Sequence, residues 1–299
     1  MNMKKVLVFG GTRFFGKRLV ENLLQAGHDV TIAARGLTVD PFGSTVKRVV
    51  VDREDEGQLQ KTLAGKSYDV VYDNLCYSPN AAKIICDVLH NKVKKYIVIS
   101  STAIYEPSLS LKESDFNPYE YPIAYGDRKD FSYSEGKRLA ESVLFQHATF
   151  PVIAVRFPVV IGENDYTKRL WFYVENIIKR KPFVVEDIKG DMSFIHEKEA
   201  GEFLAWLSSI DVSGPINACN NGAISMREVI DFVEENTGIK AFIEETEGNL
   251  GPYNGMTSCT VNSERAKELG FQFRGLKTDV HNILEYYIEE MSPSFSDVS

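Results

Sequence analysis

Short apolar runs alternate with segments of helical periodicity through the first half of this sequence, and this alternation limits the folds that the chain can adopt. The runs are rich in Val, Ile, Leu and Phe, which is typical of strands buried on both faces. Strand–helix–strand repetition at this spacing predicts an α/β fold with a doubly wound parallel sheet. We expect strands at 4–10, 28–34, 46–52, 67–74, 93–101 and 150–157, and helices at 15–25, 58–63, 81–89 and 133–147.

The pattern changes after Gly162, where helical segments and short strands no longer alternate regularly. We therefore divide the chain into a core domain at 1–162 and a smaller mixed α/β substrate lobe at 163–291, from which some strands and helices return to the core. The tail at 292–299 is expected to be disordered. In the second range we expect helices at 170–181, 197–208 and 226–237, and strands at 216–219, 240–243 and 259–261.

The composition narrows the function classes. The 299 residues carry a net charge of −8, so binding to nucleic acid is not expected. The four cysteines show no spacing typical of a disulfide framework or a metal site, and we expect reduced thiols and no bound metal. No apolar run is long enough to span a membrane, and a strand begins almost at the first residue. We therefore expect a cytoplasmic protein without a leader peptide or a membrane contact.

A glycine-rich turn follows the first expected strand. In "VLVFGGTRFFG", Gly10 and Gly11 end the strand and Gly16 enters the helix. Glycines at these positions let the backbone approach a pyrophosphate, whose charge is met by N–H groups at the helix start. The turn therefore predicts a Rossmann-type dinucleotide site. The alternative is a tight turn without a ligand, which any α/β protein can contain.

The end of the second expected strand bears on the choice of cofactor. Residues 33–36 contain no acid for the ribose hydroxyls of NAD but do contain Arg35, and guanidinium suits a 2′-phosphate. We predict NADP in preference to NAD, with Arg35 and Arg13 as the phosphate clamp and NAD as the second choice. Asp52 is expected to contact adenine. The alternatives are solvated surface arginines and an aspartate that caps Arg53 and the next turn.

A tyrosine and a lysine stand four residues apart at the start of an expected helix. Tyr133 and Lys137 therefore share one helix face. An ammonium beside a tyrosine favours the phenolate, so the pKa of Tyr133 is expected to fall from about 10 toward neutral pH. Such a tyrosine exchanges a proton with a substrate hydroxyl while hydride moves to or from a nicotinamide. Taken alone, the pair could equally lie on a solvated helix face.

Five segments together resemble the extended short-chain dehydrogenase/reductase family, which contains the NAD(P)-dependent sugar epimerases and dehydratases. In the family's order they are "FGGTRFFG", "ISSTAIY", "YSEGKRLAE", "VRFPVVIG" and "FIHEKEAGEFL". The "GGTRF" variant and "GENDYTKRLWFY" resemble a subgroup that includes chloroplast stem-loop RNA-binding proteins and their bacterial relatives. The resemblance extends over nearly the whole chain.

The resemblance implies roles for individual residues. Tyr133 would be the general acid/base, Lys137 would bond the nicotinamide ribose, and Ser101 would hold the substrate oxygen. The family also implies a homodimer formed through two helices, one of them the helix of Tyr133. The expected cofactor-binding residues are Gly10, Gly11, Thr12, Arg13, Phe14, Phe15, Gly16, Arg35, Asp52, Arg53, Leu75, Tyr133, Lys137, Phe157 and Val159.

The chain departs from the family pattern at substrate-binding positions. Val159 stands where many nucleotide-sugar enzymes have Asn, and Met192 where they often have Arg. A UDP-sugar therefore does not follow from the resemblance. A group of basic residues lies around the start of the second lobe. One interpretation is that these residues bind a phosphorylated substrate or RNA, but we favour the alternative that they form a solvated helix face. They are Arg156, Lys168, Arg169, Lys179, Arg180 and Lys181.

The sequence thus predicts an NAD(P)-dependent oxidoreductase or epimerase. Its substrate would be the hydroxyl or carbonyl of a sugar or of a nucleotide-sugar-like small molecule. The alternative is a cofactor-binding protein with little or no catalysis that binds RNA or a protein partner.

Overall fold

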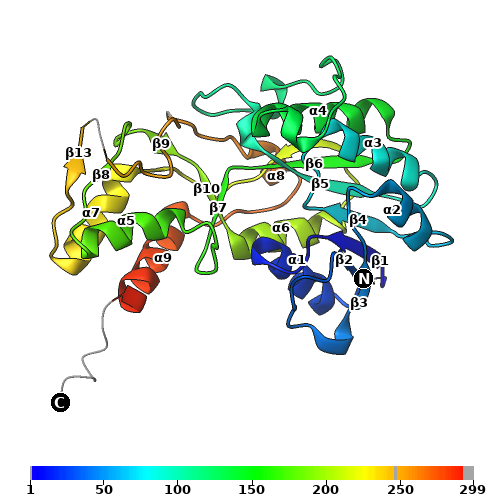
Figure 1. Ribbon diagram of the computed structural model, residues 1–299, viewed down its shortest axis with the longest axis horizontal. Helices are drawn as coiled ribbons and strands as arrows, with labels where there is room; N and C mark the ends of the chain where they lie inside the picture. Colours follow the sequence, from blue (N-terminus) through cyan, green and yellow to red (C-terminus); the bar gives the residue numbers. More distant parts are fainter. Residues whose placement is uncertain (1, 246–247, 257, 292–299) are drawn as a thin grey trace.

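A seven-stranded parallel sheet forms the centre of the computed structural model (Figure 1), which describes residues 2–245, 248–256 and 258–291. The strand order is β11-β6-β5-β4-β1-β2-β3, so β1 lies between β4 and β2 where the order reverses. Ligands of such sheets bind beyond the carboxyl ends of the strands at this point. The predicted doubly wound parallel sheet is confirmed. The strands are β1 (Lys5–Phe9), β2 (Asp29–Ala34), β3 (Lys47–Val50), β4 (Val70–Asp73), β5 (Tyr96–Ser101), β6 (Val152–Phe157) and β11 (Gly214–Asn217).

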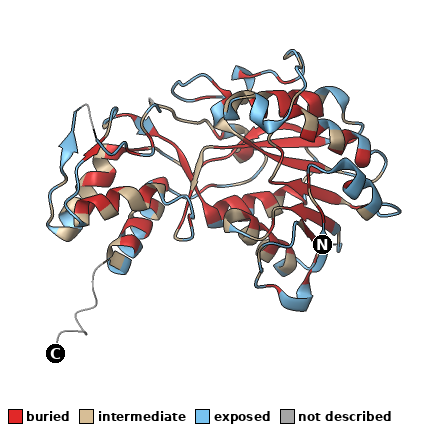
Figure 2. Cartoon of the chain, in the orientation of Figure 1, coloured by how far each residue is buried: buried red, intermediate tan, exposed pale blue. Residues whose placement is uncertain are grey.

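Helices cover both faces of the sheet, and the strands between them are largely buried, with the exception of the edge strand β3 (Figure 2). On one face α1 packs against α6. Gly201 of α6 allows this close approach, because a Cβ there would lie 2.5 Å from the Cβ of Arg18. On the other face α3 packs against α2 and α4. The helices are α1 (Phe14–Gln25), α2 (Glu56–Thr62), α3 (Pro79–Val88), α4 (Tyr133–His147) and α6 (Glu197–Leu207), with the short turns η1 (Gly43–Thr45), η2 (Thr102–Ile104), η3 (Glu113–Asp115) and η4 (Arg128–Asp130).

A smaller lobe of helices and short strand pairs lies beside the sheet (Figure 1). The apolar faces of α5, α7 and α9 pack together and form a separate core. Strand β7 follows β6 directly in the chain and pairs with β10, so the lobe begins at the carboxyl edge of the sheet. The elements of the lobe are α5 (Arg169–Ile178), α7 (Met226–Thr237), α9 (Leu276–Met291), β7 (Val159–Ile161), β8 (Phe183–Val184), β9 (Asp191–Met192), β10 (Phe194–His196), β12 (Ile224–Ser225) and β13 (Ile243–Glu244). The short helix α8 (Glu264–Glu268) instead contacts β11 of the main sheet.

Several elements after residue 162 differ from the expectations. Strand β11 and helix α6 lie on the main sheet, although both fall in the range assigned to the second lobe. Residues 259–261 form isolated bridges to Met192 and Leu111 in place of a strand. Helix α9 is not among the expected helices, although its buried residues Leu276, Val280, Ile283, Leu284 and Tyr287 follow a helical period. The expected tail at 292–299 lies outside the described residues.

Within the described ranges, no helix combines the length and the apolar character that a membrane crossing requires.

Candidate active site

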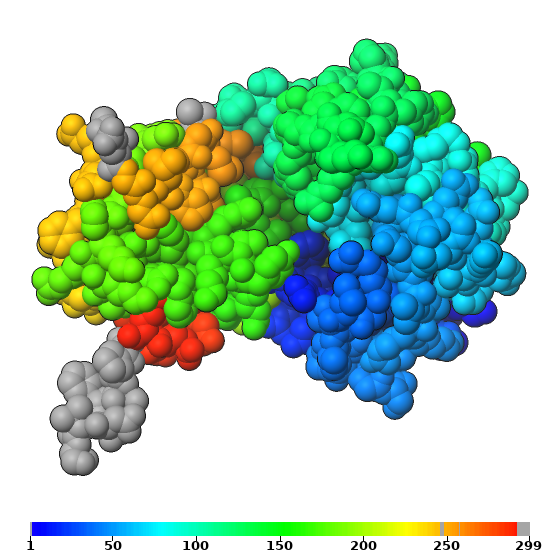
Figure 3. Space-filling model, viewed as in Figure 1, coloured from blue at the N-terminus to red at the C-terminus, as the bar shows by residue number. Residues whose placement is uncertain are grey.

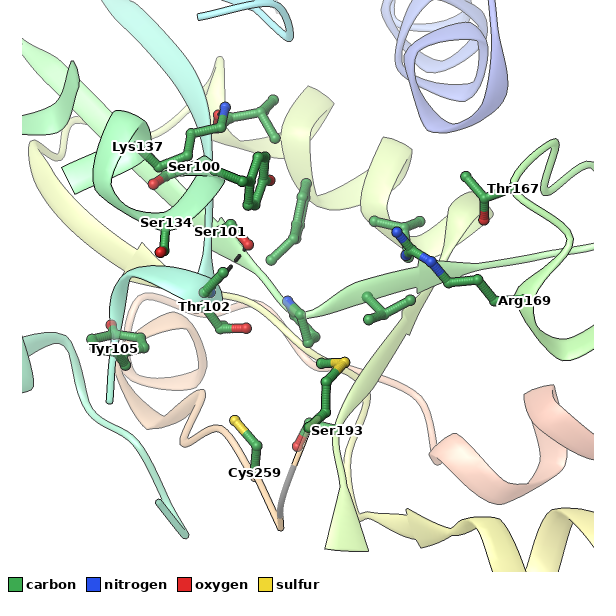
Figure 4. Close-up of a pocket in the computed structure, with 18 of the residues that line it drawn as sticks. Ser100, Ser101, Thr102, Tyr105, Ser134, Lys137, Thr167, Arg169, Ser193 and Cys259 are labelled. Carbon is green, nitrogen blue, oxygen red and sulfur yellow. Dashed lines mark hydrogen bonds between the residues drawn. The ribbon is translucent and has the colours of Figure 1, made fainter. Parts of the chain in front are cut away.

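A pocket of about 900 Å³ lies between the sheet and the smaller lobe. Residues after β4, β5 and β6 form one side of it, and residues such as Arg169 and Met192 line it from the smaller lobe. Figure 3 shows the hollowed face between the two parts. Figure 4 shows Lys137 and Ser101 on one side of the pocket and Arg169 on the other. The pocket therefore occupies the position in which ligands of doubly wound sheets bind.

The glycine turn that follows β1 has no room for side chains. Gly10 has a φ of +79°, in the left-handed region. A Cβ on Gly16 would lie only 2.3 Å from the carbonyl oxygen of Gly10. Asn74, at the end of β4, donates its Nδ2 to the same carbonyl at 3.0 Å. The start of α1 and the end of β4 thus meet at the turn, as a pyrophosphate cradle requires.

The first turn of α1 offers backbone N–H groups that the helix itself does not use. Arg13 is the N-cap residue, its side chain makes no capping hydrogen bond, and the first turn holds no acid. The free N–H groups and the positive end of the helix dipole therefore favour an anion at this position. Phe14 and Phe15 line the pocket, and the ring of Phe15 packs edge-on against Phe157 at a centroid distance of 5.9 Å.

Arg13 and Arg35 lie at the carboxyl end of β2. Arg13 Nη2 donates to Thr38 Oγ1 at 3.1 Å, and Arg35 is exposed at the start of the loop that contains Thr38. In the described part of the chain neither guanidinium forms an ion pair. Both are therefore available to a phosphate at this end of the sheet.

The structure corrects the expected role of Arg53. Its side chain is buried, with Nε 2.7 Å from Asp73 Oδ2, and its Nη1 donates to the carbonyl of Ala81 at 3.0 Å. The guanidinium therefore stabilises the core beneath β4 and is not available to a cofactor. Asp52 caps the next turn by accepting from the backbone N–H of Glu54 at 2.9 Å, as the alternative proposed.

Lys137 is buried beneath the pocket. Its Nζ donates to the carbonyl oxygens of Cys76 and Ile99, each at 2.7 Å, and lies 4.2 Å from the centroid of the Tyr77 ring. The carbonyl of Cys76 lies in the loop after β4, and that of Ile99 lies near the end of β5. The ends of these two strands therefore fix the position of the ammonium. Burial lowers the pKa of Lys137 to about 8. The Nζ lies 6.0 Å from the centroid of the Tyr133 ring.

Tyr133 and Ser101 lie together in the pocket, and the structure corrects the expected direction of the tyrosine pKa. About half of the Tyr133 side chain is exposed. The loss of water around its hydroxyl in the pocket raises the pKa of Tyr133, while hydrogen bonding with Ser101 and the charges of Arg169 and Arg128 oppose this rise. Ser101 Oγ accepts from the backbone N–H of Ala103 at 3.1 Å, which leaves its proton for donation. With its pKa above the ordinary value of 10.0, the Tyr133 hydroxyl is protonated at neutral pH.

Three pocket residues are absent from the expected site. The Arg128 guanidinium stacks on the Tyr77 ring at 4.5 Å, and the Tyr77 ring lies 6.3 Å from that of Tyr133. Arg169, which was grouped with a solvated helix face, also lines the pocket. Because these side chains come from a loop, a short turn and the other lobe, no local spacing signals their convergence. Leu75, by contrast, packs against the glycine turn, with Cγ 3.0 Å from a Cβ built on Gly10.

Arg156, which was expected on a solvated helix face, is instead buried in the core. Its side chain is fully buried and lies 2.7 Å from Glu141 Oε2. It also donates Nη1 to the Tyr105 hydroxyl at 2.8 Å and to the carbonyl of Glu113 at 2.9 Å. It therefore supports the end of β6 rather than facing solvent.

Two side chains of the pocket lining hold buried polar atoms that are available to a ligand. Ser100 Oγ and Asn74 Oδ1 are buried and have no hydrogen-bond partner among the described residues, and both side chains line the pocket. Buried polar atoms of this kind normally bond to a ligand or to water. Ser100 Oγ, Asn74 Oδ1 and the glycine turn thus provide unpaired polar groups between the end of β1 and Lys137. Val159 and Phe157 line the pocket at its junction with the smaller lobe.

Comparisons with known proteins agree with this geometry. The chloroplast stem-loop binding protein of 41 kDa b from Arabidopsis thaliana is 31% identical over 184 residues, which cover 57% of this chain and 46% of that protein. UDP-glucuronic acid decarboxylase 1 from Danio rerio is 21% identical over 275 residues, covering 81% of this chain and 62% of that protein. The chain thus spans only about half to three fifths of the length of these two relatives.

Among solved structures, MoeE5 in complex with UDP-glucose and NAD superimposes with a TM-score of 0.73 at 21% identity. The match covers 96% of this chain and all of that one, and it shows a shared fold. The model of the NAD dependent epimerase/dehydratase family matches residues 6–217, which include the glycine turn, Tyr133 and Lys137. This chain belongs to the NAD dependent epimerase/dehydratase family.

Proposed function

We propose that the protein is an NADP-dependent oxidoreductase or epimerase that acts on a hydroxyl or carbonyl of a sugar or a nucleotide-sugar-like small molecule. The observation that carries this proposal is the position of Tyr133 and Ser101 in one pocket, above the buried ammonium of Lys137. A nicotinamide bound there would supply the acceptor and donor of hydride. The protein's own contribution is to orient the substrate oxygen and to move its proton.

Tyr133 is the proposed acid/base. With its pKa raised by burial, its neutral hydroxyl donates a proton to a carbonyl oxygen as that oxygen gains charge. In the opposite direction, the cations of Lys137, Arg128 and Arg169 stabilise the phenolate that must take the proton. Ser101, whose proton is free, would hold the substrate oxygen beside Tyr133. Lys137 is held by two carbonyl oxygens and so keeps its ammonium in one place.

The similar proteins narrow the substrate class that we propose. MoeE5 is known in complexes with UDP-glucose and with UDP-glucuronic acid, each with NAD, and another relative is a UDP-glucuronic acid decarboxylase. We therefore propose UDP-glucose and UDP-glucuronic acid as the first compounds to test. We expect the parent chain to reduce NADP⁺ or to convert one of these compounds to an isomer. We expect the Tyr133→Phe variant to do neither. Tyr133→Phe should bind NADPH nearly as well as the parent, which separates chemistry from folding.

The preference for NADP is a separate part of the proposal. Its support is the pair of arginines at the end of β2, of which Arg13 is tethered to Thr38 and Arg35 is exposed. Arg35→Ser should weaken NADPH binding about tenfold or more and leave NADH binding nearly unchanged, because only NADPH carries the 2′-phosphate. Equal dissociation constants of NADPH and NADH in the parent chain would refute the preference.

A second candidate function has one observation in its favour, the 31% identity to a chloroplast stem-loop binding protein. In that case the cofactor would be structural and the protein would bind RNA. The net charge of −8 argues against it. Tight RNA binding that weakens steeply with salt, together with no turnover of any sugar nucleotide, would favour this candidate over the enzyme.

A further inference from the structure

Two guanidiniums line the pocket from opposite sides without an acidic partner. Arg128 belongs to η4, which precedes α4, and Arg169 is the first residue of α5 in the smaller lobe. In the described ranges the side chain of neither forms an ion pair or a hydrogen bond, and the Arg128 guanidinium lies over the face of the Tyr77 ring. Arg169 is half-buried and reaches toward the centre of the pocket (Figure 4), whereas Arg128 is exposed at its mouth.

Within the described ranges, neither acidic residue of the pocket lining, Glu106 or Asp165, forms an ion pair with Arg128 or Arg169. Glu106 is bound to Arg138, with Oε1 2.9 Å from Nη2. Asp165 accepts from the backbone N–H and the hydroxyl of Thr167 at 2.9 and 2.6 Å. With Lys137 included, the described lining holds more cations than acids, although the chain has a net charge of −8. The pocket is therefore a positive region on an acidic protein, and such a region attracts anions.

The stacking of Arg128 leaves its hydrogen-bonding edge unused. The guanidinium carbon lies 4.5 Å from the centroid of the Tyr77 ring, so the ring covers one face of the planar group. The N–H donors lie in the plane of the guanidinium and remain free to bind a carboxylate or a phosphate with two parallel bonds. The Tyr77 ring in turn lies 6.3 Å from the ring of Tyr133, and the charge of Arg128 acts on the Tyr133 hydroxyl.

The other arginine among the described lining residues, Arg138, is paired with Glu106 and Glu135. Val159, Met192, Met256 and Cys259 line its end toward the smaller lobe. These side chains suit apolar or weakly polar parts of a ligand. A negatively charged group of the substrate would therefore gain most beside Tyr133, and not at the far end.

We infer that the substrate carries a carboxylate or a phosphate close to its reacting hydroxyl, and that Arg128 and Arg169 bind this anion from the two sides of the pocket. The inference rests on the proposed function and specifies its substrate class as an acidic sugar or a sugar phosphate. A neutral sugar would leave both guanidiniums without an anionic partner inside the pocket. Each charge-assisted hydrogen bond of this kind changes affinity about tenfold or more.

The test measures binding and does not require turnover. The parent chain saturated with NADPH is titrated with glucose 6-phosphate, with glucuronate and with glucose as the matched neutral compound. We expect glucose 6-phosphate or glucuronate to bind at least about tenfold more tightly than glucose. The stronger of the two identifies the anion as a phosphate or a carboxylate. Arg128→Met and Arg169→Met should each reduce that preference about tenfold.

Two neighbouring lysines provide matched controls. Lys129→Met and Lys168→Met remove a positive charge one residue away from each arginine, at side chains that do not line the pocket. Both should retain the preference for the anionic compounds. Equal binding of glucose and the two anions, or equal losses in arginine and lysine variants, would overturn the inference.

The affinity for NADPH, measured without any sugar, shows whether the arginines bind the cofactor or the substrate. If Arg128→Met and Arg169→Met weaken NADPH as much as they weaken the anionic sugar, the arginines bind the cofactor and the inference is wrong. If the parent chain binds neither NADPH nor NADH, the proposed function fails and the inference fails with it. Retained NADPH binding without any preference for an anionic sugar refutes the inference alone.

Discussion

The buried ammonium of Lys137 should make the stability of the protein depend on pH in a defined way. Burial lowers the pKa of Lys137 to about 8, from an ordinary value of 10.5. Between these two values the unfolded chain binds more protons at this site than the folded chain does. The free energy of unfolding contributed by Lys137 therefore rises with pH through this window. A gap of about 2.5 units, at about 1.4 kcal/mol each, corresponds to about 3 kcal/mol.

A comparison with Lys137→Met isolates this contribution, because other buried groups titrate in the same range. Burial raises the pKa of Cys76 from 9.0 to about 11, so its contribution to the free energy of unfolding falls as pH rises. Cys76 is present in both proteins, and its effect largely cancels in the difference. Urea unfolding at about pH 7 and about pH 10 should show the parent gaining about 2 to 3 kcal/mol relative to the variant.

Two results would refute this reasoning. One is a difference between parent and variant that stays constant from about pH 7 to about pH 10. The other is a side-chain carbon resonance of Lys137 that titrates near its ordinary pKa of 10.5 instead of near 8. Either would mean that the carbonyl oxygens of Cys76 and Ile99, at 2.7 Å, replace the lost hydration of the ammonium completely.

Two further substitutions test the turn and the core. Gly16→Ala should reduce NADPH affinity more than tenfold and lower the melting temperature, because its Cβ would lie 2.3 Å from the Gly10 carbonyl oxygen. Gly57→Ala, whose Cβ would meet only ordinary contacts, should leave both unchanged. Glu141→Gln should cost about 3–5 kcal/mol in urea unfolding, because it leaves the fully buried Arg156 without its charged partner. A loss below about 1 kcal/mol would show that the remaining hydrogen bonds of Arg156 suffice.

The parts of the site that sequence could predict are those encoded within a few residues. The separation of Tyr133 and Lys137 by four positions places them on one helix whatever the rest of the chain does. The glycine turn likewise depends on contacts between Gly16 and Gly10, six positions apart. The parallel, doubly wound character of the sheet followed from the apolar runs and from the rule that parallel strands need crossover helices. These features are local, and the structure contains them where the sequence places them.

The direction of the Tyr133 pKa could not be predicted, because it is a balance between distant parts of the chain. The sequence shows the neighbouring ammonium, which favours the phenolate. It does not show how far burial disfavours that same phenolate, since the pocket closes only when the smaller lobe packs beside the sheet. The folded protein therefore keeps a neutral tyrosine, and the charges of Arg128 and Arg169 only reduce the shift.

Arg156 and Arg169 show why a basic cluster in sequence cannot be assigned one role. They are thirteen positions apart, yet Arg156 is fully buried against Glu141, while Arg169 lines the pocket and forms no ion pair within the described chain. A buried guanidinium is stable only with a partner, so the place of Glu141 on α4 decides the role of Arg156. Asp165 lines the same pocket, but within the described ranges its carboxylate forms no ion pair with Arg169. The difference lies in the partners that folding supplies, and these come from elements far away in the sequence.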